Sequence, residues 1–225
     1  MQVKVDSSLD QASSTAANNP CTLYLIRHGA TENNLSRPPL LQGSGANPEL
    51  SAEGLAQAER TAVHLSRTSI QAVYSSPLKR AIQTGTPIAQ THALPCRSIP
   101  ELKEANVGDW QDRHWAEIEK SEPESYKNFI RDPATHPYAG GESFGDVAHR
   151  VIPVFQQLVE SHPGDTIVVI GHNVVNRVFL AHVAHIPLSK SREIRQANCG
   201  INLIKYHKKT LQLVTMNAMF HLATT

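Results

Sequence analysis

Cysteine is scarce in this sequence, and its three copies form no pattern. Among 225 residues, Cys21, Cys96 and Cys199 lie far apart and are odd in number. This spacing matches neither a disulfide framework nor a set of metal ligands. A chain of this length can bury about 70 % of its unfolded surface, so we expect an apolar core to hold the fold without covalent links.

Net charge and long apolar runs are also missing. Lys and Arg number 21 and Asp and Glu 20, which gives a formal net charge of +1. Without an overall field, we predict no partnership with nucleic acid or an anionic membrane. The chain shows no signal peptide and no apolar run of about 18 residues, so we expect a cytoplasmic protein. Any anion must then be bound by a local cluster of positive groups.

The beginning of the chain differs in composition from the remainder. Residues 1–20 are rich in Ser, Ala, Asn, Gln and Asp and show no periodicity. This predicts a flexible leader outside the fold. The even composition of residues 21–225 predicts a single domain.

Short apolar runs mark the expected strands. Residues 22–26, 72–74 and 166–170 are each followed by polar or glycine residues, which is typical of buried parallel strands. Near the end, residues 201–206 and 211–216 are joined by a very short link. Such a link requires an antiparallel hairpin, so we expect a sheet that is mixed at this end.

Helical patterns lie between the apolar runs. Ser51 is a suitable N-cap for a helix over residues 52–65, and Ser76-Pro77 predicts a cap followed by proline at the first helical position. Apolar residues recur at helical spacing over residues 142–161, where Pro153 should bend the helix.

Strands that alternate with helices predict an α/β fold, a three-layer αβα sandwich around a mostly parallel mixed sheet. The polar stretch over residues 111–141 is expected to form one helix and a loop standing over the sheet.

The residues that follow the apolar runs share one chemical property. Arg27 and His28 follow the first run, Arg80 comes one helical turn after the second, and His172 follows the third. Ligands of open α/β sheets bind outside the carboxyl ends of the strands. We therefore expect these four groups to meet at one edge of the sheet.

These side chains suit phosphoryl transfer. Guanidinium groups bind phosphate oxygens in a bidentate manner and remain charged at any working pH. A histidine can attack phosphorus through one ring nitrogen when a hydrogen bond fixes the other. The leaving alkoxide then needs a proton from an acid.

Together the motifs resemble the phosphoglycerate mutase-like branch of the histidine phosphatase superfamily. Residues 25–34, LIRHGATENN, look like the Arg-His-Gly signature of that branch. The triplet alone is a weak signal, but further motifs follow in the family's order over about residues 21–222. They are residues 50–54, 74–84, 102–110, 140–143 and 171–173.

The resemblance implies a role for each matching residue. His28 matches the nucleophile that becomes phosphorylated, and Glu104 matches the proton donor that later activates water. Glu101, three residues earlier, is the rival for the acid. The residues that would hold the phosphate are Arg27, Asn34, Arg80, His172 and Asn173. The resemblance implies a phosphoglycerate mutase-like fold and metal-independent chemistry without a cofactor.

Two departures from the family pattern are visible. Residues 110–112 read Trp-Gln-Asp where Trp-Glu-Gly is common, and Asn173 replaces the glycine common after the second histidine. Neither change touches the nucleophile or the acid.

Three functions remain open at this stage. We favour a phosphomonoesterase that acts on a small phosphorylated metabolite. A cofactor-dependent phosphoglycerate mutase is the first alternative, but mutases of the family carry a longer insertion in this region, where Glu104 and Gly140 are only 36 positions apart. A non-catalytic phosphate-binding module is the second. The substrate and the oligomeric state, a homo-oligomer included, stay open. Four residues near the motifs could bind a second anionic group: Arg37, Lys103, Arg113 and His114.

Overall fold

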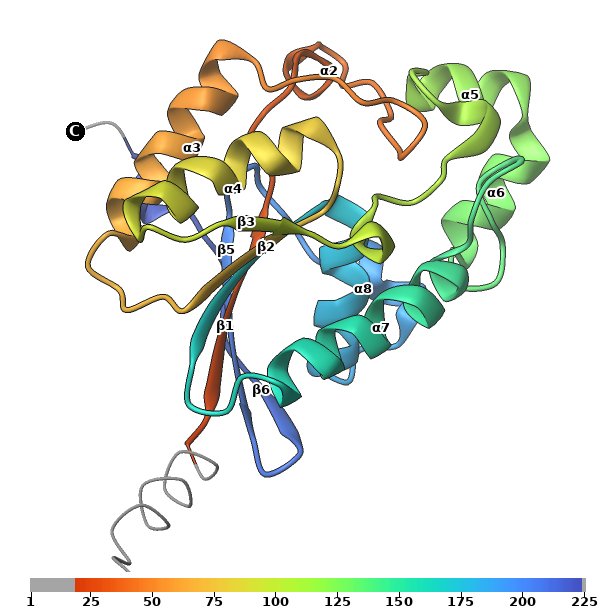
Figure 1. The fold of residues 1–225 in the computed structure, drawn as a ribbon. Coiled ribbons are helices and arrows are strands. Elements are labelled where there is room, and N and C mark those ends of the chain that lie inside the picture. Colours follow the sequence, from red (N-terminus) through yellow and green to blue (C-terminus); the bar gives the residue numbers. More distant parts are fainter. Residues whose placement is uncertain (1–18, 224–225) are drawn as a thin grey trace, which may run out of the picture.

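A computed structural model describes residues 19–223, which build one six-stranded sheet with helices on both faces (Figure 1). The strand order is β3-β2-β4-β1-β5-β6. Most of the leader predicted for residues 1–20 lies outside the described residues. The strands are β1 (Cys21–Arg27), β2 (Ala72–Ser75), β3 (Cys96–Ser98), β4 (Thr166–Gly171), β5 (Ile201–His207) and β6 (Thr210–Ala218).

The sheet is parallel over four strands and antiparallel at one end. β1, β2, β3 and β4 pair in parallel, whereas β5 pairs antiparallel with both β1 and β6. The turn between β5 and β6 consists of Lys208 and Lys209, whose φ angles of 49° and 63° are both positive. Two positive φ angles match the right-handed twist of a hairpin. The mixed α/β sheet expected from the sequence is therefore confirmed.

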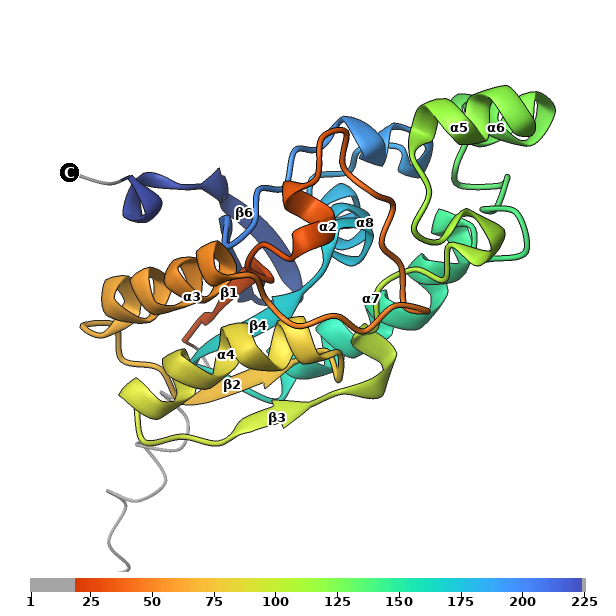
Figure 2. The same ribbon diagram turned by 90° about the horizontal axis from the view of Figure 1, so that it is seen from above.

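Four long helices cover the two faces (Figures 1 and 2). α3 (Ala52–Leu65) and α4 (Lys79–Thr91) lie on one face, and α7 (Phe144–Glu160) and α8 (Asn173–Val183) lie on the other. In β4, Val168 packs with the core under α3 and α4, whereas its neighbour Val169 packs with the core of α7 and α8. Because both faces are covered, the strand is apolar at consecutive positions, as the sequence predicts.

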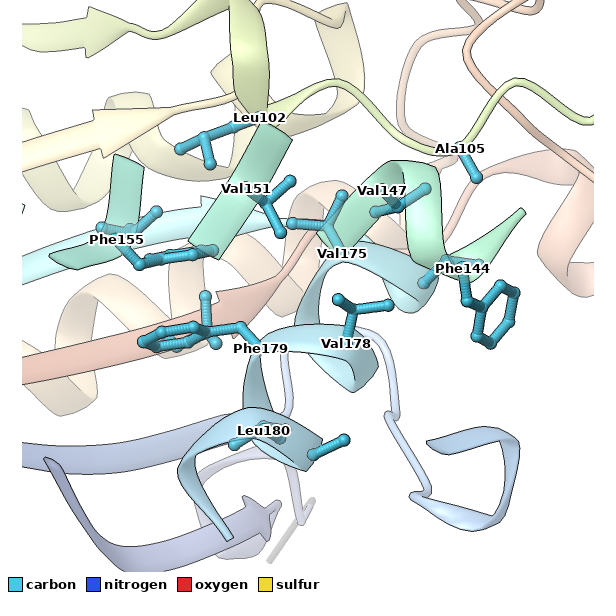
Figure 3. Close-up of a cluster of buried hydrophobic side chains, with 14 of the residues drawn as sticks. Leu102, Ala105, Phe144, Val147, Val151, Phe155, Val175, Val178, Phe179 and Leu180 are labelled. Carbon is cyan, nitrogen blue, oxygen red and sulfur yellow. The ribbon is translucent and has the colours of Figure 1, made fainter. Parts of the chain in front are cut away.

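The larger core joins α7, α8 and the sheet (Figure 3). The rings of Phe155 and Phe179 stack with centroids 4.1 Å apart, and both side chains are fully buried. α7 runs from Phe144 to Glu160 across Pro153 without interruption. This core fixes α8 against β1, so the first residues of α8 lie beside the carboxyl end of the central strands.

The beginnings of the helices confirm one prediction and correct another. Ser51 caps α3, and its hydroxyl accepts from the Gly54 N–H at 3.1 Å. Ser76 does not cap α4, which begins at Lys79 with Leu78 at the N-cap position. The Ser76 N–H instead donates to the carbonyl of Ile170 at 3.0 Å, so this residue still belongs to the end of the sheet.

The stretch over residues 111–141 contains two helices where the sequence suggested one. α5 (Trp115–Ser121) and α6 (Pro123–Arg131) are separated at Pro123. Glu122, the residue before this proline, has non-helical φ and ψ angles of −135° and 54°, and Pro123 occupies the first turn of α6, where its missing N–H costs no helical hydrogen bond. We call residues 115–139 the cap, because both views show α5 and α6 projecting beyond the sheet (Figures 1 and 2).

An aromatic cluster anchors the cap to the remainder of the molecule. Phe129 is fully buried, and its ring lies 4.3 Å from that of Tyr138 and 5.4 Å from that of Trp110, centroid to centroid. Trp115 and Phe144 complete the cluster at 5.9 and 5.8 Å from Phe129. The short remaining helices of the described residues are α2 (Glu32–Leu35), η1 (Pro100–Leu102), η2 (Gly108–Trp110), η3 (Leu188–Glu193) and η4 (Phe220–Leu222).

Candidate active site

A pocket of about 380 Å³ opens between the carboxyl end of β1, the start of α8 and the cap. Its size suits a small molecule. Five of the seven predicted site residues line it: Arg27, His28, Asn34, Glu104 and Asn173. The other two, Arg80 and His172, are fully buried beside His28.

His28 directly follows β1 and is 3 % exposed. Its Nδ1 lies 2.7 Å from the carbonyl oxygen of Gly29, so Nδ1 carries the proton and donates, and Nε2 keeps its lone pair. Burial, followed by the charges of Arg80 and Arg27, lowers the pKa of His28 well below 6.5. The ring is therefore a neutral base at neutral pH.

The residue after His28 must be glycine for a steric reason. A Cβ atom on Gly29 would lie 2.6 Å from the carbonyl oxygen of Gly54, in the first turn of α3. The close approach of α3 holds the backbone that orients the His28 ring.

His172 follows β4 and is the N-cap residue of α8. Its ring centroid lies 5.1 Å from that of His28. Both ring nitrogens are buried, and neither has a hydrogen-bond partner among the described residues. Burial, followed by the positive charge of Arg80, lowers its pKa well below 6.5. A buried polar group without a partner is costly, so this ring is suited to an oxygen atom of a ligand.

Two arginines supply positive charge to the histidine pair. Arg27 donates from Nη1 to the Gln196 carbonyl at 2.6 Å, and its Nε is buried without a partner among residues 19–223. Arg80 donates to the carbonyls of Gly43 and Ala46 at 3.1 and 2.9 Å. Burial lowers the pKa of each guanidinium to about 10, so both remain charged at neutral pH.

Glu104 lies at the beginning of α8. Its carboxylate accepts from the N–H groups of Ala105 at 2.9 Å and Val174 at 3.1 Å. Backbone N–H groups and the positive end of the helix dipole hold an acidic side chain well at this position. The rival Glu101 is exposed and does not line the pocket, so position favours Glu104.

The motif at residues 140–143 holds the segment that carries Glu104. Glu142 forms an ion pair with Arg150 at 2.8 Å and accepts from the Asn106 N–H at 2.7 Å. Arg150 also donates to the carbonyls of residues 101, 103 and 104 at 2.6, 2.8 and 3.2 Å. Ser143 caps α7 through the Asp146 N–H. The motif therefore positions the predicted acid without touching a ligand.

The two predicted asparagines reach the pocket from different helices, α2 and α8. Asn34 accepts from the Thr31 N–H at 3.2 Å and from Asn198 at 3.1 Å, so its side chain also caps α2. Asn173 begins α8, and its buried Oδ1 has no partner in the described part of the chain.

Sequence reasoning missed several residues of the pocket. Arg177, Arg192 and Tyr138 all line it. Arg177 could have been found, because it lies four residues after Asn173 and therefore on the same face of α8. No motif points to Arg192 in η3. The four cationic residues suggested by the sequence for a second anion do not line the pocket, and Arg113 pairs instead with Glu122.

Two further findings concern the described residues only. Among residues 19–223, no three or more His, Cys, Asp and Glu side chains are grouped so that they could hold a metal ion. In the same range, no helix has the length and apolar character needed to cross a membrane.

Comparison with known proteins agrees with this geometry. A family model described as histidine phosphatase superfamily (branch 1) matches residues 23–219. Phosphoserine phosphatase 1 of Hydrogenobacter thermophilus is 29 % identical over 89 % of this chain and 93 % of its own length. A metal-independent phosphoserine phosphatase of Arabidopsis thaliana is 31 % identical over 90 % and 83 %.

The solved structure of Bacillus stearothermophilus YhfR superposes with a TM-score of 0.82 at 27 % identity. It covers 90 % of this chain and all of that protein. The sheet, the paired histidines and the family match lead to one conclusion: the chain belongs to branch 1 of the histidine phosphatase superfamily and is a phosphoric monoester hydrolase.

Proposed function

We propose that this protein hydrolyses a small phosphorylated metabolite through a phosphohistidine formed on Nε2 of His28. The observation that carries the proposal is the hydrogen bond from Nδ1 to the Gly29 carbonyl, which leaves Nε2 as the nucleophile. The lowered pKa of His28 supports it, because only the neutral ring has a lone pair for attack.

In the first step, Nε2 attacks phosphorus and the bond from phosphorus to the leaving oxygen breaks. Glu104 donates a proton to that oxygen. Charge on the phosphoryl oxygens is stabilised by Arg27 and Arg80, with His172 as a further donor. Asn34 and Asn173 complete the phosphate-binding set from the pocket walls.

In the second step, the Glu104 carboxylate takes a proton from a water molecule, which attacks phosphorus. The bond from phosphorus to Nε2 breaks, inorganic phosphate leaves, and His28 recovers its lone pair. Glu104 is then protonated again, ready for the next substrate.

Hydrolysis is favoured over mutase activity by the size of the cap. A mutase must retain its phosphorylated intermediate away from water, which calls for an extensive cover. Here the cover consists of the two short helices α5 and α6. The names of the two relatives, phosphoserine phosphatases, support a small phosphorylated acid as the first substrate to assay.

The test is the H28A variant in buffer that contains EDTA. Wild-type enzyme incubated with a ³²P-labelled substrate should yield an acid-labile, base-stable phosphoenzyme after rapid quenching. H28A should lose this species and at least about 1,000-fold in kcat for p-nitrophenyl phosphate. His149→Ala, which removes an exposed histidine of α7, is the matched control. A labelled phosphoenzyme in H28A would overturn the assignment, and so would bisphosphoglycerate-dependent isomerisation in place of phosphate release.

A further inference from the structure

The pocket contains more positive charge than one phosphoryl group requires. Its charged lining consists of Arg27, Arg177, Arg192 and a single carboxylate, Glu104. The proposed function assigns Arg27 and Glu104 to the phosphoryl group. The other two arginines then have no task in the chemistry.

Arg192 is held in the pocket wall by aromatic rings. Its guanidinium carbon lies 5.4 Å from the ring centroids of both Trp115 and Phe129. This arrangement orients the side chain through cation–π contacts and leaves its N–H groups available. No ion pair joins Arg192 to any carboxylate in residues 19–223. Burial lowers the pKa of this guanidinium, as expected for a charge without a close counter-ion.

Arg177 extends from α8 into the same part of the pocket. Its Nε donates to the carbonyl of Ile194 at 2.8 Å, which fixes the guanidinium and leaves its other N–H groups free for a ligand. It forms no ion pair within the described residues either. The residue follows Asn173 by four positions, about 6 Å along the helix axis. A three-carbon phosphorylated acid separates its two anionic groups by a comparable length.

Tyr138 does not neutralise these arginines. Burial raises the pKa of its phenol above the usual value, so the hydroxyl stays protonated and uncharged. The pocket therefore presents two oriented guanidinium groups beside a neutral hydroxyl. Guanidinium groups in such an arrangement bind carboxylates and phosphates. An uncharged substrate group in this position would leave the two arginines without a counter-ion.

We propose that Arg192 and Arg177 form a subsite for a second anionic group of the substrate, a carboxylate or a second phosphate. This inference rests on the proposed function and names the substrate class of the same site. Arg192 and Arg177 are therefore specificity-determining residues, and the preferred substrates are phosphomonoesters with two separated negative groups.

Pairs of substrates that differ only in the second group provide the test. D-3-phosphoglycerate carries a carboxylate where glycerol 3-phosphate carries a hydroxymethyl group. Fructose 1,6-bisphosphate carries a second phosphate that fructose 6-phosphate lacks. For wild-type enzyme we expect the member that carries the second anionic group to have about 10- to 100-fold higher kcat/KM in at least one pair. A preference within the first pair identifies a carboxylate as the second anionic group, and a preference within the second pair identifies a phosphate.

Variants connect this preference to the two arginines. R192Q and R177Q should each reduce the kcat/KM ratio of the preferred pair at least fivefold, on the basis of a lost charge-assisted hydrogen bond. R195Q is the matched control, because Arg195 is exposed, lies three residues after Arg192 and does not line the pocket. Its ratio should equal that of the wild type.

The outcomes separate this inference from the proposed function. Equal kcat/KM within both wild-type pairs, or an unchanged ratio in folded R192Q and folded R177Q, would overturn the subsite. Thermal unfolding of each variant establishes that it is folded. If only one of the two variants folds, its kcat/KM ratio alone decides the test. If wild-type enzyme hydrolyses p-nitrophenyl phosphate but shows no preference within either substrate pair, only the subsite is refuted. Absence of a phosphoenzyme on His28 would refute the proposed function itself.

Discussion

Glu104 has two roles in the proposed mechanism, those of acid and base, and both depend on the position of its carboxyl group. The proposed mechanism requires it to protonate a leaving oxygen and then to deprotonate water, and N–H groups of the backbone hold its carboxylate in place. An alkoxide needs the proton, whereas p-nitrophenolate leaves readily without it. The proposed mechanism therefore makes a prediction that depends on the leaving group.

We expect E104Q to slow hydrolysis of an alkyl phosphate by about 100- to 10,000-fold and that of p-nitrophenyl phosphate much less. Steady-state kcat values with both substrates provide the measurement. E101Q is the control, since Glu101 is exposed, lies three residues before Glu104 and does not line the pocket. Equal slowing of both substrates by E104Q would remove this residue from the acid role.

The difference between found and missed site residues has a physical origin. Arg27, His28 and Gly29 form a recognisable motif because local structure restricts it: a Cβ atom on Gly29 would collide with the carbonyl oxygen of Gly54. Arg192 has no such local constraint. Its position depends on the rings of Trp115 and Phe129, which belong to the distant cap. In sequence, such an arginine cannot be distinguished from one that faces solvent.

At the level of elements, the cap depends on Phe129. This side chain is fully buried in α6 and contacts the rings of Trp110 and Tyr138. We expect F129A to lower the free energy of unfolding by about 3–5 kcal/mol, because it leaves a large cavity in a packed cluster. Urea denaturation monitored by tryptophan fluorescence measures this change.

Ile130→Ala provides the matched control for that experiment. Ile130 follows Phe129 in the same helix but is 36 % exposed, so its removal should cost much less. The F129A variant should also show a raised KM, because Trp115 and Tyr138 line the pocket and lose their common neighbour. A cost for F129A no greater than that of I130A would show that the cluster does not hold the cap.

Element boundaries were predicted well where one local signal acts alone. Ser51 and the apolar pattern behind it define α3, whose bounds match the predicted residues 52–65. Ser76 carries an equally good capping signal, but its N–H is taken by the sheet through Ile170. Tertiary pairing overrides a local cap in this case. The division between α5 and α6 falls at Pro123, but proline alone does not predict it, because α7 continues across Pro153.

For the whole molecule, the buried histidines connect stability to pH. The pKa of His28 and that of His172 lie well below 6.5, and that of His221 is lowered to about 4 by burial and by His64. Above pH 6.5 these rings are neutral in both states. As the pH falls below 6.5, these histidines bind protons in the unfolded chain but remain neutral in the folded protein. Stability should therefore decrease from pH 6.5 toward pH 4.

Thermal unfolding between pH 8 and pH 5.5 measures this dependence above the ordinary carboxyl pKa values of 4.5 for Glu122 and 3.8 for Asp132 and Asp146, all of which are lowered further in the folded protein. H221N should show a smaller decrease than the wild type. H149N, which changes an exposed ring of α7, is its control. A midpoint that stays constant or rises as the pH falls from 6.5 would contradict the burial of neutral histidines.

The overall architecture of the protein is the feature that the sequence predicts best. Three apolar runs covered on both faces and one tight hairpin are sufficient to define a mixed sheet with a ligand site at the carboxyl ends. Val168 and Val169 face opposite layers, so only a buried strand could accept both. The shape of the pocket could not be predicted, because it depends on how the cap packs against η3 and α8.

The carbonyl that orients the His28 ring belongs to the peptide chain itself, one residue further on. No side-chain substitution removes this backbone carbonyl, so every variant that folds and keeps His28 also keeps Nε2 as the ring nitrogen without a proton. Residual turnover after loss of either arginine or of the acid should thus pass through the same phosphorylated nitrogen, more slowly but by an unaltered route.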